Sequence, residues 1–123
     1  DVFFEGAGIK VKLDPEQAQQ CQGRVGQEAV IGIRPEALFP RPTDDANKED
    51  QTVNVTVGVV EPLGSTMDVY TRTSDDQRLV ARIKAEPMNE DTELKMYLDM
   101  TRVHIFEPGT YGINLTNKDA VAV

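Results

Sequence analysis

The sequence is poor in the residues that most often form cross-links or metal sites. Its 123 residues include one cysteine, one histidine and no tryptophan. The single cysteine, Cys21, cannot form an internal disulfide, so a reducing compartment is expected. Because no second cysteine or histidine lies near it in the sequence, Cys21 is interpreted as a passive, partly buried thiol rather than a nucleophile or a metal ligand.

Basic residues, aromatic residues and long apolar runs are also scarce. The chain has 13 lysines and arginines against 21 acidic residues, which gives a net charge of −8, and aromatic residues make up 6% of it. A nucleic-acid-binding surface needs clustered basic residues, and single-strand binding also needs stacking aromatics. No apolar run approaches the length of a membrane span, and no signal-peptide pattern is present. The composition therefore argues against nucleic-acid binding and membrane insertion.

Common catalytic patterns are missing as well. Residues 58–65 contain glycines but no lysine, so they do not form a phosphate-binding loop. The run Gly6-Ala7-Gly8 lacks the third glycine of a dinucleotide-binding fingerprint. His104 lies in an alternating strand pattern, without the partners that a general base or a metal ligand needs. No enzymatic activity is therefore expected of this chain.

Alternating apolar and polar residues predict a series of short strands. The most regular is 52–60, in which Val53, Val55, Val57 and Val59 are expected to face one side. Further strands are predicted at 9–13, 29–33, 67–71, 78–83, 93–98 and 103–106. Turns rich in proline, glycine or aspartate separate them. A chain of this length holds one core, so we expect a single all-β domain over residues 1–123 with at most one short helix. This is a small antiparallel barrel or sandwich, and the valine-rich middle fits a five-stranded barrel of the OB type.

Three segments are expected to lie outside the strands. Residues 1–8 form an irregular lead-in, in which Phe3 and Phe4 pack either into the core or onto a neighbouring domain. Asp14 and the proline after it are suited to open a short helix. Residues 39–50 combine prolines with a charge run and are interpreted as a solvated loop. Their carboxylates lack the spacing of a calcium-binding loop, so no metal site is predicted there.

The stretch 31–38, which reads Ile-Gly-Ile-Arg-Pro-Glu-Ala-Leu, is the most distinctive part of the chain. Pro35 fixes its own φ and biases Arg34 toward extended geometry, so the strand should end there. A short helical turn should follow, with Pro35 in its first position. We expect Arg34 and Glu36 to be at least partly buried, and bonded within the domain or across the interface between its β units.

Residues 31–38 resemble the motif that marks the TOBE region, the C-terminal domain of ABC importer ATPase subunits of the maltose and glycerol-phosphate type. Further segments resemble the same family in the same order, namely 59–65, 79–82, 103–107 and 109–112. Residues 86–91 depart from the family pattern, because they contain no glycine where the family has one. The resemblance covers residues 23–112, with 1–22 as a lead-in and 113–123 as a terminal strand or tail. The family-motif and structural residues are Gly32, Arg34, Pro35, Glu36, Glu61, Gly64, His104 and Phe106.

The resemblance implies an OB-like barrel, often built as a pair of small packed β units, that acts as a non-catalytic regulatory and dimerisation domain. It implies that the ATPase domain lies upstream, outside this chain, and binds the ATP and magnesium, so that this chain holds no cofactor or metal. The implied partners are that ATPase domain, a second ATPase subunit in a homodimer, the membrane permease subunits and, in some relatives, a regulatory protein. The implied cargo is a sugar or a related organic solute. The implied location is cytoplasmic, peripheral to the inner face of the cell membrane.

An alternative function is an OB-type module that senses a small ligand or an oxyanion, because some TOBE domains bind molybdate-like anions. The candidates for an anion site are Arg34, Arg72, Arg78 and Arg82. These arginines are scattered in the sequence and are interpreted as solvated residues of strand edges. The importer domain is therefore the leading hypothesis, and the sensor the second.

Overall fold

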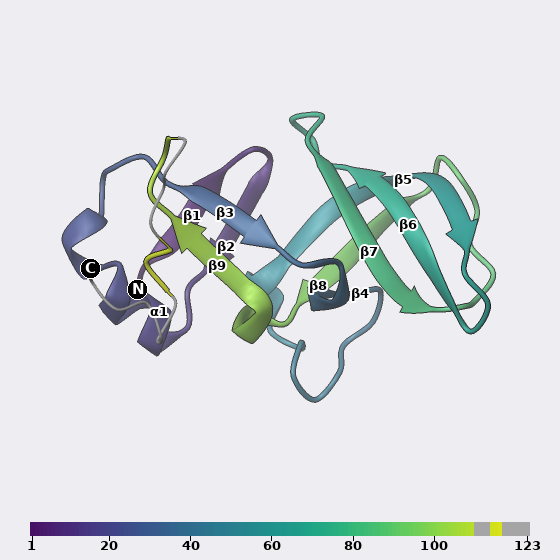
Figure 1. Cartoon of the computed structure of the whole chain (residues 1–123), viewed down its shortest axis with the longest axis horizontal. Coiled ribbons are helices and arrows are strands. Elements are labelled where there is room, and N and C mark those ends of the chain that lie inside the picture. The colour runs from purple at the N-terminus through teal and green to yellow at the C-terminus, as the bar shows by residue number, and fades with distance from the viewer. Residues whose placement is uncertain (110–113, 117–123) are drawn as a thin grey trace.

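The computed structural model describes residues 1–109 and 114–116, and these residues form two β units side by side (Figure 1). The split unit contains β1 (Phe3–Gly6), β2 (Ile9–Lys12), α1 (Pro15–Gln20), β3 (Val30–Ile33) and β9 (Val103–Phe106). The barrel unit contains β4 (Leu38–Phe39), β5 (Thr52–Pro62), β6 (Thr66–Arg72), β7 (Arg78–Lys84) and β8 (Glu93–Leu98). Short 3-10 turns lie at η1 (Gln22–Arg24), η2 (Pro35–Ala37), η3 (Glu49–Gln51) and η4 (Met100–Arg102). The chain thus leaves the split unit after β3, builds the barrel unit and returns as β9.

The barrel unit is one antiparallel sheet with the strand order β4-β8-β5-β6-β7. Its longest strand, β5, pairs with β8 on one side and with β6 on the other. The two outer strands, β4 and β7, contact each other without being paired, so the sheet nearly closes on itself. The predicted all-β, OB-like fold is confirmed, as is its division into two packed β units.

The alternation along β5 is broken once. The valines up to Val57 are buried, but the side chain of Val59 is 59% exposed. The pairing of β5 with β6 shifts register between Val57 and Val60, so Gly58 and Val59 form a β-bulge. An extra residue in one strand moves the following side chains to the opposite face. The prediction that all four valines of this strand face one side is therefore wrong for Val59.

The split unit is made of two antiparallel strand pairs, β1 with β2 and β3 with β9. Residues 3–6 form a strand where the sequence pattern predicts an irregular lead-in, because their partner β2 supplies the hydrogen bonds. Phe4 packs against the core, whereas Phe3 is 43% exposed. The predicted short helix is confirmed as α1, and the N–H of Asp14 donates to the side-chain oxygen of Gln17 at 3.1 Å.

One hydrophobic core runs through both units. Val11 of β2 and Ile105 of β9 belong to the same cluster of buried residues as Val55 and Leu98 of the barrel unit. The largest fully buried side chains are Leu38, Met96, Leu98, Met100, Val11, Val57, Val69 and Val103. These residues come from both units, so the two units share one continuous core.

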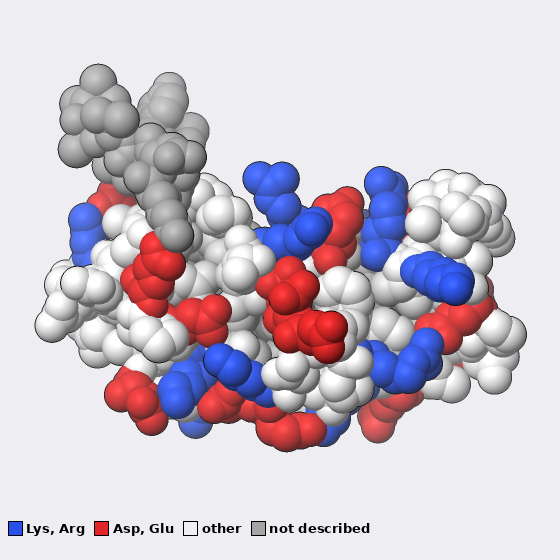
Figure 2. Space-filling model, turned by 90° about the horizontal axis from the view of Figure 1, so that it is seen from below, with Lys and Arg blue, Asp and Glu red and all other residues white. Residues whose placement is uncertain are grey.

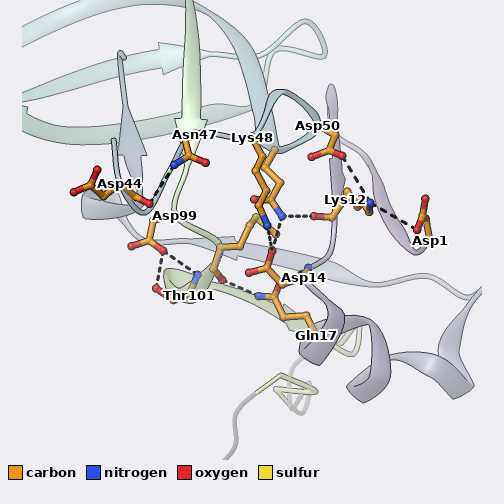
Figure 3. Close-up of polar contacts among 12 residues, drawn as sticks. Asp1, Lys12, Asp14, Gln17, Asp44, Asn47, Lys48, Asp50, Asp99 and Thr101 are labelled. Atoms are coloured by element: carbon orange, nitrogen blue, oxygen red, sulfur yellow. Dashed lines mark hydrogen bonds and ion pairs between the residues drawn. The ribbon is translucent and has the colours of Figure 1, made fainter. Parts of the chain in front are cut away.

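Two buried glutamines, Gln17 and Gln51, add hydrogen bonds around the place where the units meet, and Figure 3 shows the first of them. Gln17 on α1 donates from Nε2 to the carbonyl oxygens of Met100 at 2.7 Å and Val103 at 3.0 Å. Gln51, just before β5, donates to the carbonyl of Lys12 at 3.0 Å and to Oδ1 of Asp14 at 2.6 Å. Backbone carbonyls that are buried in this way need partners, so the glutamines fix how the segments meet.

The C-terminal part of the chain is described only in residues 114–116. Asn114 forms an isolated bridge with Phe106, and the N–H of Leu115 donates to the carbonyl of Ile105 at 2.7 Å. The rest of the predicted terminal strand or tail (113–123), and the family segment 109–112 beyond its first residue, lie outside the described residues. Within the described part of the chain, no helix is long and apolar enough to span a bilayer.

Candidate functional site

Three of the motif residues meet on the β3–β9 pair. Gly32 lies opposite His104, and the ring of Phe106 covers the position of the missing side chain. A Cβ at residue 32 would stand 2.8 Å from Cε1 of Phe106, which is too close for any unshifted side chain. The His104 ring centroid lies 6.5 Å from that of Phe106, and its Nδ1 is 3.4 Å from Oγ1 of Thr116. The motif glycine is therefore the residue that makes room for the aromatic ring.

The corner after β3 has the predicted geometry. Arg34 is extended, with φ −70° and ψ 146°, and the turn η2 starts at Pro35. The N–H of Ala37 donates to the carbonyl of Arg34 at 2.9 Å, and the carbonyl of Ala37 accepts from the N–H of Asp99 at 2.8 Å. The corner is thus hydrogen-bonded to the segment that follows β8.

The prediction that Arg34 is at least partly buried and bonded is wrong. Its side chain is exposed and makes no hydrogen bond or ion pair with any residue that the structure describes. Ile33 packs against the core, and the next residue of an extended strand points to the opposite side, here toward solvent. Glu36 is half-buried, as predicted, but the predicted bond is not found, because its carboxylate accepts no hydrogen bond from a described residue. Its charge instead attracts Arg82 on β7.

Arg82 is held by the neighbouring strand β6. Its Nε lies 2.8 Å from Oδ1 of Asp68 and its Nη2 lies 3.0 Å from Oδ2, so the pair is bidentate. The Asp68 side chain is 10% exposed and that of Arg82 is 46% exposed. The hydrogen bond to Arg82 lowers the pKa of Asp68 and raises that of Arg82, to which Glu36 adds a smaller attraction. The sequence alone did not indicate Asp68, because the pair depends on the register of β6 and β7.

A cleft of about 720 Å³ opens beside η2, where β4 and β7 leave the barrel unit unclosed. We call it the seam cleft. One wall follows β4, and the opposite wall is the end of β7 with the first residues of β6. Its lining residues are Glu36, Phe39, Pro40, Arg41, Pro42, Thr43, Ser65, Thr66, Arg82, Ile83, Lys84, Ala85 and Glu86. An ion pair between Arg41 and Glu86 connects the two walls.

The remaining motif residues lie in the β5–β6 hairpin. Glu61 is exposed on β5 opposite Asp68, and Gly64 turns the loop with φ +93°, where a residue without Cβ is favoured. Neither lines the seam cleft, although Ser65 next to Gly64 does. The motif residues are therefore distributed over the β3–β9 pair, the corner and this hairpin, and only Glu36 lines the cleft.

The four arginines named as candidates for an anion site do not all meet in one place. Arg72 and Arg78 face each other on β6 and β7 and are exposed, as predicted for solvated strand residues. Figure 2 shows acidic and basic side chains interspersed on the face seen from below. No group of three or more His, Cys, Asp or Glu residues that could hold a metal ion is found in residues 1–109 and 114–116. Burial raises the pKa of the Cys21 thiol, which favours its uncharged form.

The TOBE domain family matches residues 31–106. The trehalose/maltose import ATP-binding protein MalK of Thermococcus litoralis is 31% identical to this chain, over 89% of the chain and 30% of its own length. The oligosaccharides import ATP-binding protein MsmX of Bacillus subtilis is 30% identical, over 72% of the chain and 24% of its own length. The sn-glycerol-3-phosphate import ATP-binding protein UgpC of Chromohalobacter salexigens is 30% identical, over 76% of the chain and 25% of its own length. The chain thus spans less than a third of the length of these curated relatives.

A solved structure has the same fold at low sequence identity. The cytoplasmic molybdate-binding protein ModG, in a crystal form with molybdate bound, superposes with a TM-score of 0.65 and 15% identity, over 84% of this chain and 79% of its own. At that identity the likeness concerns the fold. The TOBE domain family, by contrast, matches residues 31–106, which include the corner, the barrel unit, β9 and their motif residues. This chain therefore belongs to the TOBE domain family.

Proposed function

We propose that this chain is the non-catalytic regulatory and dimerisation domain of the ATP-binding subunit of an ABC importer for sugars or related organic solutes. The observation that carries the proposal is that the four curated relatives are all import or transport ATP-binding proteins, of which this chain matches 23–30% of the length. The ATP and magnesium sites are then assigned to the unmatched part of such a protein.

The partners and the location follow from the same assignment. The domain would contact its own ATPase domain and a second copy of the subunit, while permease subunits and a regulatory protein would bind the assembled importer. Such an importer subunit works in the cytoplasm, at the inner face of the cell membrane.

Removal of residues 1–123 from the longer protein tests this proposal. We expect the shortened subunit to retain ATP hydrolysis but to dimerise more weakly in analytical ultracentrifugation and to lose its response to regulators. The 123-residue chain alone should not hydrolyse ATP. Hydrolysis by the isolated chain, or unchanged dimerisation and regulation after its removal, would contradict the proposal.

The second candidate is an oxyanion sensor, favoured by the fold that this chain shares with the molybdate-binding protein ModG. Against it stand the net charge of −8 and the exposure of all four candidate arginines. Arg72 and Arg78 face each other, but only Arg82 of the four lines the seam cleft. Calorimetric titration with molybdate and with sulfate separates the two functions. We expect no saturable heat, and tight binding of either anion would favour the sensor.

A further inference from the structure

We propose that the seam cleft binds a neutral saccharide of one or two sugar rings. The choice of this ligand class rests on the proposed function, whereas the cleft itself rests on the geometry of β4, β7 and η2. Its volume of about 720 Å³ lies within the range of small-molecule sites, roughly 300–1,000 Å³. Such sites combine apolar walls with a few fixed polar groups, and the seam cleft has both.

The walls of the cleft suit the C–H faces of sugar rings. Phe39 ends β4, and Pro40 and Pro42 follow it, so an aromatic ring and two rigid apolar rings line one side. Ile83 and Ala85 line the other side. The walls come from the two outer strands of the sheet, which are not hydrogen-bonded to each other, so the opening is part of the barrel architecture.

Arg82 and Glu36 provide a donor and an acceptor within this lining. The guanidinium carries five N–H groups, of which two are bound by Asp68, so the group is oriented while N–H groups remain for a ligand. The Glu36 carboxylate accepts no hydrogen bond from any described residue, and it lies close enough to Arg82 to attract it. A hydroxyl group both donates and accepts, so one sugar can satisfy both side chains.

The charges of the cleft favour a neutral ligand over an ion. Arg41 is paired with Glu86, and Arg82 is paired with Asp68 and attracted by Glu36. Lys84 also lines the cleft and forms no salt bridge with a described residue, so three basic groups stand against the three carboxylates of Glu36, Asp68 and Glu86. An oxyanion bound at Arg82 would meet the Glu36 carboxylate, and like charges at close range repel. A cation at Glu36 would in turn meet the guanidinium of Arg82. This balance distinguishes the cleft from an anion site.

The ion pair between Arg41 and Glu86 does not hold the cleft shut. Arg41 follows β4 and Glu86 follows β7, so the pair connects the two walls. The Arg41 side chain is 70% exposed, and exposed ion pairs contribute little to stability. The pair can therefore open without a large cost when a ligand enters.

The test is a titration of the ¹⁵N-labelled 123-residue chain with maltose, followed by nuclear magnetic resonance. We expect saturable shifts of the amides of Phe39, Thr66 and Ile83 and of the Nε–H of Arg82, with a Kd of about 1 mM, the weak end of specific binding. Absence of saturable shifts at about ten times that concentration, or shifts that map to another part of the chain, would overturn the proposal.

Matched variants locate the site. Glu36→Gln should weaken binding about five-fold, because a charge-assisted hydrogen bond is roughly twice as strong as a neutral one. Phe39→Leu should weaken it about ten-fold through the lost ring. Glu61→Gln alters an exposed carboxylate of the same unit and Phe3→Leu an exposed aromatic of the split unit, both outside the cleft, and they should leave the Kd unchanged. If the cleft variants and these controls weaken maltose binding equally, the saccharide does not bind in the seam cleft. The amide spectrum of each variant verifies that it is folded.

Two outcomes separate this proposal from the proposed function. If maltose leaves the chain unchanged while removal of residues 1–123 still weakens dimerisation and regulation of the longer protein, the saccharide site is refuted and the importer domain stands. If maltose binds at the cleft while that removal has no effect, the importer role is refuted. Competition by molybdate or sulfate at the same amides would overturn the charge argument.

Discussion

The substitution Gln17→Ala tests how strongly the polar contacts between chain segments stabilise the fold. Gln17 is 8% exposed and donates two hydrogen bonds to the carbonyls of Met100 and Val103, at 2.7 and 3.0 Å. It also accepts one from the N–H of Asp14. Alanine removes all three bonds, although the Met100 carbonyl still accepts from the backbone N–H of Val103. A typical hydrogen bond contributes about 0.5–1.5 kcal/mol net, so we expect a total loss of about 2–4 kcal/mol.

A loss of that size is measurable, since a domain is typically stable by only about 5–15 kcal/mol. Urea unfolding followed by circular dichroism gives the free energy of unfolding for the wild type and the variants. Gln19→Ala is the matched control, because it removes the same side chain from an exposed position of the same helix and should change stability by less than about 0.5 kcal/mol.

Equal effects of the two alanine substitutions would refute the role assigned to Gln17. The variant Gln17→Glu tests how the loss of stability depends on pH. An ionised carboxylate cannot donate to the two carbonyls, whereas a protonated one can donate to one of them. The pKa of the introduced carboxyl group should therefore be raised in the folded state. The variant should lose most stability at neutral pH and less in acid. A deficit that does not depend on pH would contradict this reasoning.

Three further predictions concern other parts of the fold. Gly32→Ala should cost about 1–3 kcal/mol because its Cβ meets the Phe106 ring, and the double variant with Phe106→Leu should recover part of that loss in urea unfolding. Gly8→Ala should destabilise more than Gly64→Ala, as judged by thermal melting, because both have positive φ but only the first would place Cβ within 3 Å of other atoms. Asp68→Asn should destabilise the protein at neutral pH. The hydrogen bond to the guanidinium lowers the folded pKa of Asp68, so its contribution is present above the unfolded pKa and is lost as pH falls through the folded value. If Asp68→Asn destabilises the protein equally in strong acid, the ionised Asp68 carboxylate is not the source of the lost stability.

Most strands could be predicted because their signal is local. The alternating residues of β2, β5 and β8 are visible in the sequence, and Pro35 alone places the end of β3. β1 was missed because its strand form depends on pairing with β2. The bulge at Val59 was missed because the sequence alternation continues through it, and only the pairing with β6 shows the shift.

The candidate site could be predicted only in part. The motif around Glu36 led to the correct corner, but the burial expected of Arg34 is wrong because the strand turns that side chain outward. The lining of the seam cleft comes from η2, the segment after β4, the start of β6 and the end of β7, which share no sequence spacing. Asp68 and Arg82 meet because of strand register. Spatial convergence of this kind leaves no pattern in the chain.

The return of the chain from β8 to β9 has a consequence for how the protein is made. β3 pairs with β9, with Ile33 opposite Val103, so the whole barrel unit is translated between the two partners. As synthesis proceeds from the N-terminus, the barrel strands can pair with each other while β3 still lacks its neighbour. The first hairpin, β1–β2, has only two strands and is marginal alone. Within this chain, the residues that leave the ribosome first are therefore among the last to reach their final packing, and their apolar side chains depend on the arrival of residues 103–106 for cover.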